Sequence, residues 1–529
     1  MKGFGKQNNS KKKKVIKKKN NPSIEKIINQ AIQFQLQGKI SKAANYYQNF
    51  INQGLKDHRI FSNYGVILED LGKRQEAEVS YRKAIEIEPD FAMAHCNLGN
   101  ILKDLGKLKD AELSTRKAIE IEPDFAEAYS NLGNILKDFG KLQDAELPYR
   151  KAIQLNPNLA EAHFNLGILL RDLGKLNEAE LSLRKAIALK PDFAEAYFSL
   201  STLQYSNENK IWKDQLFSDS ILKNKSQKNL VNFYFARANI LHKEKNYEDS
   251  SKFLKLANQI KLILHPSKAD SLINKSKVLL IESDKQEINQ KEYTESPKSI
   301  FIVGMPRSGS TLLESILSMN NNVYDLGEKN IFEMSFLNWK KPSQKSTLAD
   351  LYFKGANTSS NKIRTITNKW LYNYQYTGII ATNIPESKII HCFRNPLDNI
   401  LSIYRANFAR GNTFASSLVD CAKVYLDQEE VMTAYKKRFR STIYDLNYDL
   451  LVQNPNKEIK SLISWLGWDW HNQYLSPHLN PRSVSTASNI QVRYPINSKS
   501  VGGWKSYEEM LKPAMEILIQ NEKYKNLKY

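Results

Sequence analysis

Residues 299–317 read SIFIVGMPRSGSTLLESIL, and this stretch decides how the second half of the chain folds. Four apolar residues that favour strands, Ile300 to Val303, run into the loop 304–311, and apolar residues then recur at helical spacing up to Leu317. The pattern predicts a strand, a tight loop and a helix. The N–H groups of such a loop and the positive end of the helix dipole favour an anion. The expected ligand is therefore a phosphate or a sulfate.

The loop is not a Walker A motif, because that motif requires G-x-x-x-x-G-K-[ST] and Ser310 stands where the lysine belongs. Its cation is Arg307, whose rigid fork of donors can reach two oxygens at once, whereas a Walker lysine acts with Mg²⁺ on a triphosphate. The loop therefore predicts a metal-free anion site and disfavours a P-loop kinase. The alternative is an ordinary strand-to-helix turn with Gly and Ser as turn residues.

Length and composition set the outer limits. A chain of 529 residues predicts two to four domains. The formal net charge is +21, and nine lysines fall within residues 1–20, so the remainder is moderately basic. This balance favours anionic ligands, but without a zinc-finger or RNP signature no specific nucleic acid is expected. Cys96, Cys392 and Cys421 lie far apart without a CxxC pair, which indicates a reducing compartment and neither disulfides nor zinc.

The N-terminal residues 1–23 predict a disordered basic tail. They have no apolar h-region, so a secretory signal is not expected, and no run of eighteen apolar residues predicts a membrane span. The expected location is cytoplasmic. A solubilising tail is the preferred interpretation over contact with an anionic membrane, RNA or an acidic protein.

Residues 24–263 carry an internal period of 34. Glycines, alanines and prolines recur in register: Gly65, Gly99, Gly133 and Gly167; Gly72, Gly106, Gly140 and Gly174; Ala77, Ala111, Ala145 and Ala179; Pro89, Pro123, Pro157 and Pro191. The pattern resembles tetratricopeptide repeats, in which small residues let two helices pack closely and a proline ends the second helix. The resemblance implies an all-α solenoid that binds a protein or peptide.

Five repeats are clear, and two weaker ones are expected from Ala194 and around Ala236 and Tyr247, where they would dock the solenoid onto the next domain. Pro148 falls inside the second helix of its repeat, so a kink or a late helix start is expected there. Residues 264–298 lose the period and predict a connecting helix or linker.

Asparagines also recur at the same period, on the first helix of each repeat: Asn63, Asn97, Asn131 and Asn165. They resemble the asparagine ladder in the repeats of O-linked N-acetylglucosamine transferases, which grips an extended peptide backbone. An amide suits this task because it both donates and accepts hydrogen bonds. The alternative is that these side chains bond within their own repeat, and both interpretations stay open.

Two motifs of the second half match one family. The segment 300–317 resembles the 5′-phosphosulfate loop of sulfotransferases that use 3′-phosphoadenosine 5′-phosphosulfate (PAPS). The segment 386–404, ESKIIHCFRNPLDNILSIY, resembles their 3′-phosphate segment, a strand followed by an arginine and, eight residues later, a serine. The resemblance covers residues 299–529 and is closest to protein-tyrosine sulfotransferases and their bacterial relatives with tetratricopeptide repeats. It implies an α/β P-loop-like domain with a central parallel sheet.

The resemblance also implies catalytic residues. Arg307 and Lys369 match the cations that act on the transferred group, and Glu328 matches the catalytic base. The family often has Asp before that lysine, whereas this chain has Asn368. Glu328 could instead be an exposed helix-opening residue, but catalysis is the preferred interpretation. His391 is a rival base, although its place inside an apolar strand favours a structural role.

The residues implied for PAPS form a larger set: Pro306, Arg307, Ser308, Gly309, Ser310 and Thr311 for the 5′ side, Arg394 and Ser402 for the 3′-phosphate, Tyr448 beside the adenine, and Ser488 in the closing segment. The family usually has Lys or Arg before the tryptophan of that segment, where this chain has Gly503. Lys499 or Lys505 could compensate. A core tyrosine is the alternative for Tyr448, and no metal is expected.

The sequence thus predicts a PAPS-dependent sulfotransferase whose repeats recruit a protein acceptor, with tyrosine preferred over a carbohydrate hydroxyl. The alternative is a non-catalytic repeat scaffold with a nucleotide-binding relic domain. The sequence leaves the oligomeric state open, a homodimer included.

Overall fold

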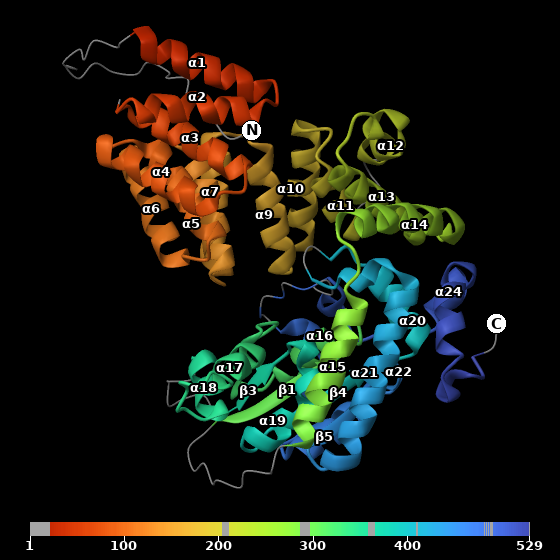
Figure 1. Ribbon diagram of the computed structural model, residues 1–529. Helices are drawn as coiled ribbons and strands as arrows, with labels where there is room; N and C mark the ends of the chain where they lie inside the picture. The colour runs from red at the N-terminus through yellow and green to blue at the C-terminus, as the bar shows by residue number, and fades with distance from the viewer. Residues whose placement is uncertain are drawn as a thin grey trace. The chain divides into compact units, whose positions relative to one another are not determined.

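A computed structural model describes residues 22–54, 56–203, 211–285, 297–357, 365–408, 411–480, 482, 484, 486 and 490–527 (Figure 1). Contacts between residues divide the chain into an N-terminal unit that ends at Pro191 and a C-terminal unit that begins at Asp192. The predicted tail lies outside the described residues, apart from Pro22 and Ser23, which open the first helix.

The N-terminal unit is entirely helical among its described residues. Its helices are α1 (Pro22–Leu36), α2 (Ile40–Asn52), α3 (His58–Asp70), α4 (Arg74–Ile87), α5 (Ala92–Asp104), α6 (Leu108–Ile121), α7 (Ala126–Asp138), α8 (Leu142–Leu155), α9 (Ala160–Asp172) and α10 (Leu176–Leu189). They form antiparallel pairs, red to ochre in Figure 1, and consecutive pairs stack on one another. The predicted all-α solenoid is confirmed.

Small residues make the close packing of each pair possible. A Cβ at Gly133 of α7 would lie 2.6 Å from the ring of Tyr149 on α8, and Gly65 meets Tyr81 in the same way. Gly140 has a different role. It follows the first helix of its repeat with φ +82°, a left-handed conformation that favours glycine, and a Cβ there would have open space around it.

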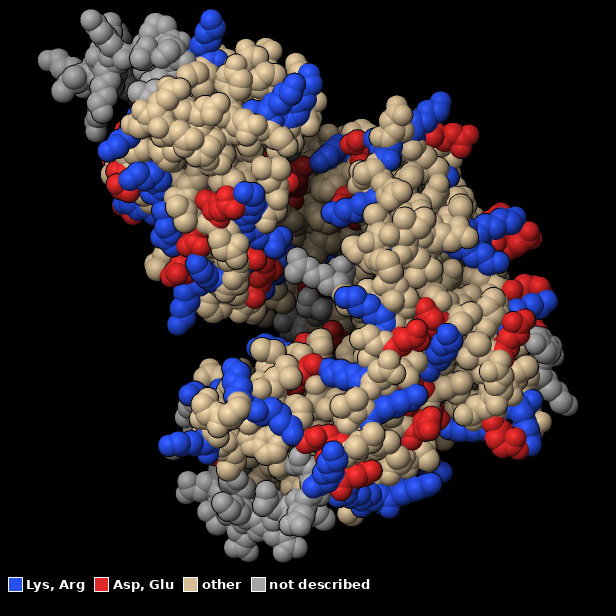
Figure 2. All heavy atoms as spheres, in the orientation of Figure 1, with Lys and Arg blue, Asp and Glu red and all other residues tan. Residues whose placement is uncertain are grey.

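Ion pairs join successive repeats on the outer helices. Glu78 of α4 accepts from Arg82 of its own helix and from Lys107 of the next repeat at 2.8 Å, and Glu112 and Glu146 repeat the arrangement. Figure 2 shows the result, acidic and basic side chains interspersed over the visible face of these repeats. The positive net charge therefore does not collect into one stripe on this face.

Pro148 does not delay its helix. The helix α8 begins at Leu142 and has 14 residues, as the equivalent helices α6 and α10 do. The expected late start is wrong, because the helix extends on both sides of the proline and packs through it: Pro148 is buried.

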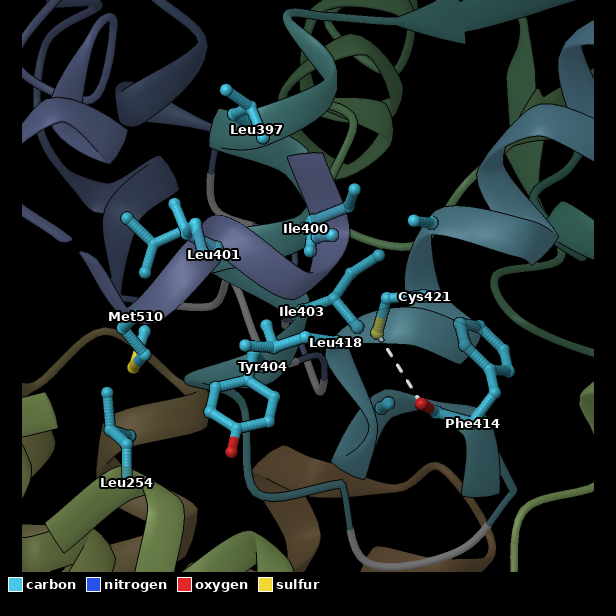
Figure 3. Close-up of a cluster of buried hydrophobic side chains, with 14 of the residues drawn as sticks. Leu254, Leu397, Ile400, Leu401, Ile403, Tyr404, Phe414, Leu418, Cys421 and Met510 are labelled. Carbon is cyan, nitrogen blue, oxygen red and sulfur yellow. Dashed lines mark hydrogen bonds between the residues drawn. The ribbon is translucent and has the colours of Figure 1, made fainter. Parts of the chain in front are cut away.

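The C-terminal unit begins with five helices, α11 (Ala194–Thr202), α12 (Ile211–Phe217), α13 (Gln227–Lys243), α14 (Tyr247–Leu264) and α15 (Ala269–Asp284). The pair α13 and α14 matches the position of the last weak repeat. It packs on the domain that follows: Leu254 of α14 lies in one buried cluster with Tyr404 and Met510 (Figure 3). Helix α15 packs along the long helix α21 (Leu418–Phe439).

A parallel sheet forms the centre of this unit. Its described strands are β1 (Lys298–Gly304), β2 (Val323–Asp325), β3 (Thr365–Asn368), β4 (Lys388–Phe393) and β5 (Ile443–Asn447), in the order β2-β3-β1-β4-β5. All four pairings are parallel. Because the chain leaves β1 in one direction for β2 and β3 and then crosses to β4, β1 lies at the switch point where such sheets bind ligands.

Helices cover both faces of the sheet. They are α16 (Ser310–Leu317), α17 (Ile331–Trp339), α18 (Leu348–Gly355), α19 (Thr377–Asn383), α20 (Pro396–Tyr404), α21, α22 (Tyr448–Gln453), α23 (Pro455–Leu466) and α24 (Glu508–Leu518). Phe301 and Val303 of β1 join a cluster with α17 to α19 and α21, whereas Ile300 and Ile302 join a cluster with α16 and α23. This alternation explains the continuous apolar run of β1, which is buried on both faces.

Candidate active site

The predicted site residues follow the carboxyl ends of the strands. Each strand of the described sheet contributes one, within three residues of its end: Arg307 after β1, Glu328 after β2, Lys369 after β3, Arg394 after β4 and Tyr448 after β5. In a parallel sheet these ends lie on one edge, so residues spread over 142 positions of sequence come together.

The loop after β1 is packed closely against residues of β4, α20 and α22. Gly304 has φ +139°, and a Cβ there would lie 2.2 Å from the carbonyl oxygen of Cys392. Gly309 has φ +91°, and its Cβ would meet the ring of Tyr448 at 2.2 Å. The Asn399 amide of α20 donates to the Pro306 carbonyl at 3.0 Å. Only glycine fits at 304 and 309, so the loop has one shape.

Arg307 occupies the left-handed region, with φ +65°. Its Nε donates to Ser402 Oγ at 3.0 Å, and its NH2 group donates to Gln491 Oε1 at 2.9 Å. Burial and then the positive charge of Arg394 lower the pKa of Arg307 to about 10. An added anion would relieve this repulsion between two guanidinium groups.

The rest of the loop meets the start of α16. Ser308, Ser310 and Thr311 are buried, and Thr311 Oγ1 lies 3.3 Å from Thr486 Oγ1 of the closing segment. Ser310 and Thr311 are the first two residues of α16, where N–H groups have no partner within the helix.

Lys369 and Glu328 form an ion pair. Lys369 Nζ donates to Glu328 Oε1 at 2.8 Å, and the lysine side chain is fully buried whereas the glutamate is 48% exposed. The predicted base and one predicted cation are therefore in direct contact. Burial lowers the pKa of Lys369, but the charges of Glu314 and Glu328 outweigh this and raise it above its usual value.

Sequence reasoning missed three charged residues that lie behind this pair. Glu314 of α16 lies 3.3 Å from Lys369 Nζ and 2.7 Å from Arg482, and Arg482 also pairs with Asp325 at the end of β2. Burial alone would raise the pKa of Glu314, but Lys369 and Arg482 hold it below its usual value. Burial and then the Glu314 charge raise the pKa of Asp325 to about 7.

Arg394 is buried at the end of β4, against carboxylates and a carbonyl. Its NH2 group donates to the Ser500 carbonyl at 2.8 Å, its Nε lies 3.6 Å from Asp449 Oδ1, and the guanidinium lies 4.7 Å from the centre of the Tyr448 ring. Tyr448 is half-buried and contacts both the loop and this arginine, so it is not a core tyrosine. Ser402, eight residues after Arg394, contacts Arg307.

The closing segment near the C-terminus is bound to α20. Asp398 accepts from the backbone N–H of Gly502 at 2.7 Å and of Trp504 at 2.9 Å. Lys499 and Lys505, the proposed substitutes for a cation at Gly503, are both exposed. The predicted ligand Ser488 lies outside the described residues.

Of the predicted nucleotide-binding residues that the structure describes, two have a buried polar atom without a hydrogen-bond partner, Ser308 Oγ and Arg394 Nε; in the surrounding cluster Arg482 Nε, Glu314 Oε1 and Asp449 Oδ1 are also unpaired. Ser308 belongs to the loop after β1, and Arg394 is the residue after β4. Buried polar groups are normally bonded, and each unpaired one costs about 1–3 kcal/mol. Ser308 Oγ and Arg394 Nε are both donors, so the arrangement fits a ligand with anionic groups, as PAPS has at its 5′ and 3′ ends.

The departures from the family pattern are accommodated locally. Asn368 is buried, and its Oδ1 accepts from Trp370 N and from the Asn373 amide, so it shapes the turn after β3.

His391, the rival base, is buried in β4, with Nδ1 3.2 Å from Asp445 and Nε2 2.6 Å from the Gln428 amide. Burial lowers its pKa, and the ring has no free nitrogen for an acceptor.

The four asparagines of the ladder lie on α3, α5, α7 and α9, the first helix of each pair, and all are half-buried. The Asn131 amide donates to Cys96 Sγ of the preceding repeat at 3.2 Å. That bond is neither to a peptide nor within its own repeat. It joins two neighbouring repeats. The bond uses the amide N–H of Asn131, and the carbonyl oxygen of the same side chain takes no part in it.

No group of three or more His, Cys, Asp or Glu side chains that could hold a metal occurs in the described part of the chain. Likewise, none of the described helices is long and apolar enough to cross a membrane.

Comparison with protein families divides the chain in the same order as its sequence motifs. Residues 297–472 match a model described as "Sulfotransferase family". Residues 65–106 and 133–170 match a TPR repeat model, and further tetratricopeptide models match 92–125, 115–146 and 160–193. The chain therefore carries tetratricopeptide repeats and, after them, a domain that matches the sulfotransferase family.

Two curated relatives extend this comparison. A protein of Aquifex aeolicus (strain VF5), named "Uncharacterized protein", is 32% identical over 252 residues, which cover 43% of this chain and 33% of the relative. This chain thus spans about a third of that relative's length. A protein of Caenorhabditis briggsae, named "Putative protein-tyrosine sulfotransferase", is 22% identical over 237 residues, 39% of this chain and 80% of the relative.

Two solved structures are similar to part of this chain. YrrB, described as a TPR protein with an unusual peptide-binding site, is 21% identical with a TM-score of 0.27 and covers 38% of this chain and 99% of its own. A tetratricopeptide repeat protein from Parabacteroides merdae ATCC 43184 is 18% identical with a TM-score of 0.33 and covers 45% of this chain and 94% of its own.

Proposed function

From a chain that joins tetratricopeptide repeats to a domain matching the sulfotransferase family, we propose a sulfotransferase that moves the sulfuryl group of PAPS to a hydroxyl acceptor. The observation that carries the proposal is the edge of the sheet, where the strand ends supply an anion loop, an ion pair between the buried Lys369 and the half-exposed Glu328, and a second arginine. Loop, base and cations are the groups that such a transfer requires.

The catalytic roles follow from these positions. Glu328 takes the proton of the acceptor hydroxyl, which its partial exposure allows. Arg307 and Lys369 stabilise the oxygens on which negative charge develops. The 2.8 Å contact between Lys369 and Glu328 supports base and cation acting on the same reacting group.

The binding roles divide between the two ends of the nucleotide. Pro306 to Thr311 would hold the 5′-phosphate and sulfate, with the unpaired Ser308 hydroxyl directed at them. Arg394 and Ser402 would hold the 3′-phosphate, and Tyr448 would pack against the adenine. Ser488 stays a proposed ligand of the closing segment. PAPS supplies the activated sulfuryl group, and the chain supplies position and charge.

We place the acceptor on a protein, as a tyrosine hydroxyl. The name of the Caenorhabditis relative supports tyrosine over a carbohydrate hydroxyl, and the repeats support recruitment of a protein. Within the repeats the carbonyl oxygens of Asn63, Asn97, Asn131 and Asn165 would accept from the acceptor's backbone. The competing function is a non-catalytic scaffold, and Asn368 and Gly503 are the residues that favour it.

Calorimetric titration of the full chain with adenosine 3′,5′-bisphosphate tests the nucleotide site, with adenosine 5′-phosphate as the control ligand. We expect binding that needs the 3′-phosphate and that Arg394→Ala abolishes. Arg440→Ala is the matched control, because this arginine is 64% exposed and pairs with Asp445, which is not a predicted nucleotide-binding residue. Absence of binding by a folded protein would contradict the proposed enzymatic function and favour the non-catalytic scaffold.

Transfer of labelled sulfate from PAPS then tests the activity itself, with panels of tyrosine peptides and glycans as acceptors. Sulfate label on a tyrosine peptide supports the proposed acceptor. Label on glycans alone would show that the acceptor is a carbohydrate hydroxyl and not tyrosine. Nucleotide binding without transfer to any acceptor would favour the scaffold.

A further inference from the structure

The buried lysine of the site has two ionic partners of different kinds. Lys369 is fully buried, and its ammonium contacts Glu328 Oε1 at 2.8 Å and Glu314 Oε2 at 3.3 Å. Glu328 is 48% exposed, whereas Glu314 is 1% exposed. One carboxylate is therefore accessible to an acceptor, and the other is enclosed with the lysine.

Glu314 is itself fixed by a second cation. Its Oε2 accepts from Arg482 NH2 at 2.7 Å, a residue 168 positions later in the chain. The backbone of Arg482 is in turn anchored: its N–H donates to Asn480 Oδ1 at 3.0 Å, and its carbonyl accepts from Arg493 at 2.6 Å. The Asn480 amide donates to the Ser315 carbonyl of α16, beside Glu314. The carboxylate is thus held from two sides.

The proposed reaction makes the second carboxylate necessary. As the acceptor oxygen bonds to sulfur, the sulfur–oxygen bond to the phosphate breaks, and its electron pair stays on the phosphate oxygen. The proton of the acceptor hydroxyl goes to Glu328, which then loses its charge. Lys369 would at that moment be a buried cation without its closest partner, and an unpaired buried charge is costly.

We propose that Glu314 is a positioning residue that keeps Lys369 charged and in place while Glu328 holds the proton. The inference rests on the proposed function, because it assigns Glu328 as the base. It adds a residue of α16, the helix that follows the loop after β1, to which the sequence motifs assign no role.

The charged and titratable groups around Lys369 come from several elements. Glu314 lies on α16, Glu328 after β2, Arg482 in the closing segment, and the buried thiol of Cys392 on β4. Burial raises the pKa of Cys392, so the thiol is neutral beside the lysine. Among these groups the two glutamates alone raise the pKa of Lys369, and Arg482 opposes them.

The test replaces Glu314 with glutamine in the full chain and follows sulfate transfer against pH. We expect kcat to fall by about ten- to a hundredfold, while KM for PAPS changes much less. We also expect the loss of activity at alkaline pH to begin about one pH unit lower or more, because one of the two charges that keep Lys369 protonated is gone. A role in folding alone would not move this limb of the profile.

Asp325→Asn is the matched control. Asp325 is an acidic residue of the same cluster, and it contacts Arg482 and Glu314 but not Lys369. Its substitution should leave the alkaline limb near its wild-type position, whatever it does to the rate. Glu314→Asp keeps the charge with a shorter reach, so kcat should fall while the limb stays closer to wild type.

A measurement without turnover separates this inference from the proposed function. Protein with ¹³C-labelled lysine is titrated by NMR, and the Lys369 signal is assigned by its loss in Lys369→Arg. A lower Lys369 pKa in Glu314→Gln supports the inference even if no acceptor is ever labelled, a result that would count against the proposed function alone.

Three results would overturn the inference. The first is a wild-type alkaline limb and a wild-type Lys369 titration in Glu314→Gln. The second is an equal shift in Asp325→Asn. Should Glu314→Gln fail to fold, Glu314→Asp decides, and an unchanged kcat in that variant is the third.

Discussion

Removal of the unpaired hydroxyl of Ser308 should change the affinity for the nucleotide without lowering the stability of the fold. The hydroxyl makes no hydrogen bond within the described chain, so Ser308→Ala removes no native bond. We expect the free energy of unfolding to stay within about 0.5 kcal/mol of wild type or to rise, because an unsatisfied group is lost. Affinity for adenosine 3′,5′-bisphosphate should fall about tenfold or more, since a bond to a charged group is worth about 1.5–3 kcal/mol.

Calorimetry and denaturant unfolding measure the two effects on the same protein. Ser315→Ala is the control, because that hydroxyl, seven residues later on α16, already donates to the Thr311 carbonyl at 2.9 Å. A Ser308→Ala protein that binds as wild type does would show that the hydroxyl does not face the ligand.

In the proposed reaction, Glu328 is the base that accepts the proton of the acceptor hydroxyl. Glu328→Gln keeps the size of the side chain and can still accept from Lys369, but it is no base. We expect kcat to fall by about 10²–10⁴-fold with little change in bisphosphate affinity. Glu386→Gln, at a carboxylate that is 70% exposed, serves as the control and should transfer sulfate at the wild-type rate.

The raised pKa of Asp325 makes stability depend on pH. An unfolded aspartate titrates near 3.9, whereas Asp325 in the fold titrates at about 7, so the folded state binds more protons in between. The free energy of unfolding that this group contributes is therefore full below about pH 4 and is lost as the pH rises through 7. We expect Asp325→Asn to lose less stability than wild type between pH 5 and 8, measured by urea unfolding.

The comparison of wild type with Asp325→Asn removes the titration of this group. Glu314 has a lowered pKa and so titrates below the window, and His391 titrates in both proteins. Parallel pH profiles for wild type and Asp325→Asn would contradict the assignment.

The site could be predicted from sequence as far as each residue follows a strand. Arg307 follows the apolar run that marks β1, so the strand–loop–helix pattern pointed to it, whereas Arg394 after β4 was predicted from the family resemblance of its segment. Glu314 was missed because it is a single charged residue within α16, and its partner Arg482 is 168 residues away. No local rule of spacing or propensity relates two residues at that separation.

At the scale of the element, α8 contains the clearest defect of the repeats. Where α4 and α6 have serines whose hydroxyls donate to the Phe61 and His95 carbonyls, α8 has Pro148, which lacks both that hydroxyl and a backbone N–H. We expect Pro148→Ser to raise the free energy of unfolding of the repeats by about 1–3 kcal/mol, because both bonds return. Far-UV circular dichroism during thermal unfolding measures it.

Ser114→Pro is the reciprocal variant, placed at the same position one repeat earlier. It should lower stability by a similar amount. If Pro148→Ser were destabilising, the buried proline ring would contribute more through packing than the missing bonds cost.

The order of the strands shows what element-level prediction leaves out. Strand, loop and helix were predicted around residues 300–317, and the parallel sheet followed from the family resemblance. The order β2-β3-β1-β4-β5 depends on which apolar faces meet across long connections, and a pattern along the chain does not encode that pairing.

At the scale of the whole molecule, the last repeat pair belongs with the transferase domain. Helices α13, α14 and α15 contribute Val231, Phe235, Ala238, Leu254, Ala257, Ala269 and Leu279 to its buried clusters. We expect a fragment of residues 192–529 to fold and to bind adenosine 3′,5′-bisphosphate. A fragment of residues 297–529 should aggregate, since it exposes the surfaces that these side chains cover, each worth about 1.5–3 kcal/mol when large.

Size-exclusion chromatography and circular dichroism of the two fragments measure the difference. A monodisperse, folded 297–529 fragment would show that α13 to α15 are dispensable. The contacts also explain why the 34-residue period fades after Pro191. The helices that follow pack against the core of the C-terminal domain as well as against neighbouring helices, so their apolar positions no longer follow the repeat pattern alone.

The division after Pro191 has a consequence for how such chains diversify. A genetic crossover at this joint exchanges whole repeats and cuts no element of the C-terminal unit. If the proposed function holds, recombination there would produce enzymes that share one reaction and differ in the proteins they modify. Another recognition domain could then be grafted at the same joint, and the proposed sulfate transfer would act on the proteins which that domain binds.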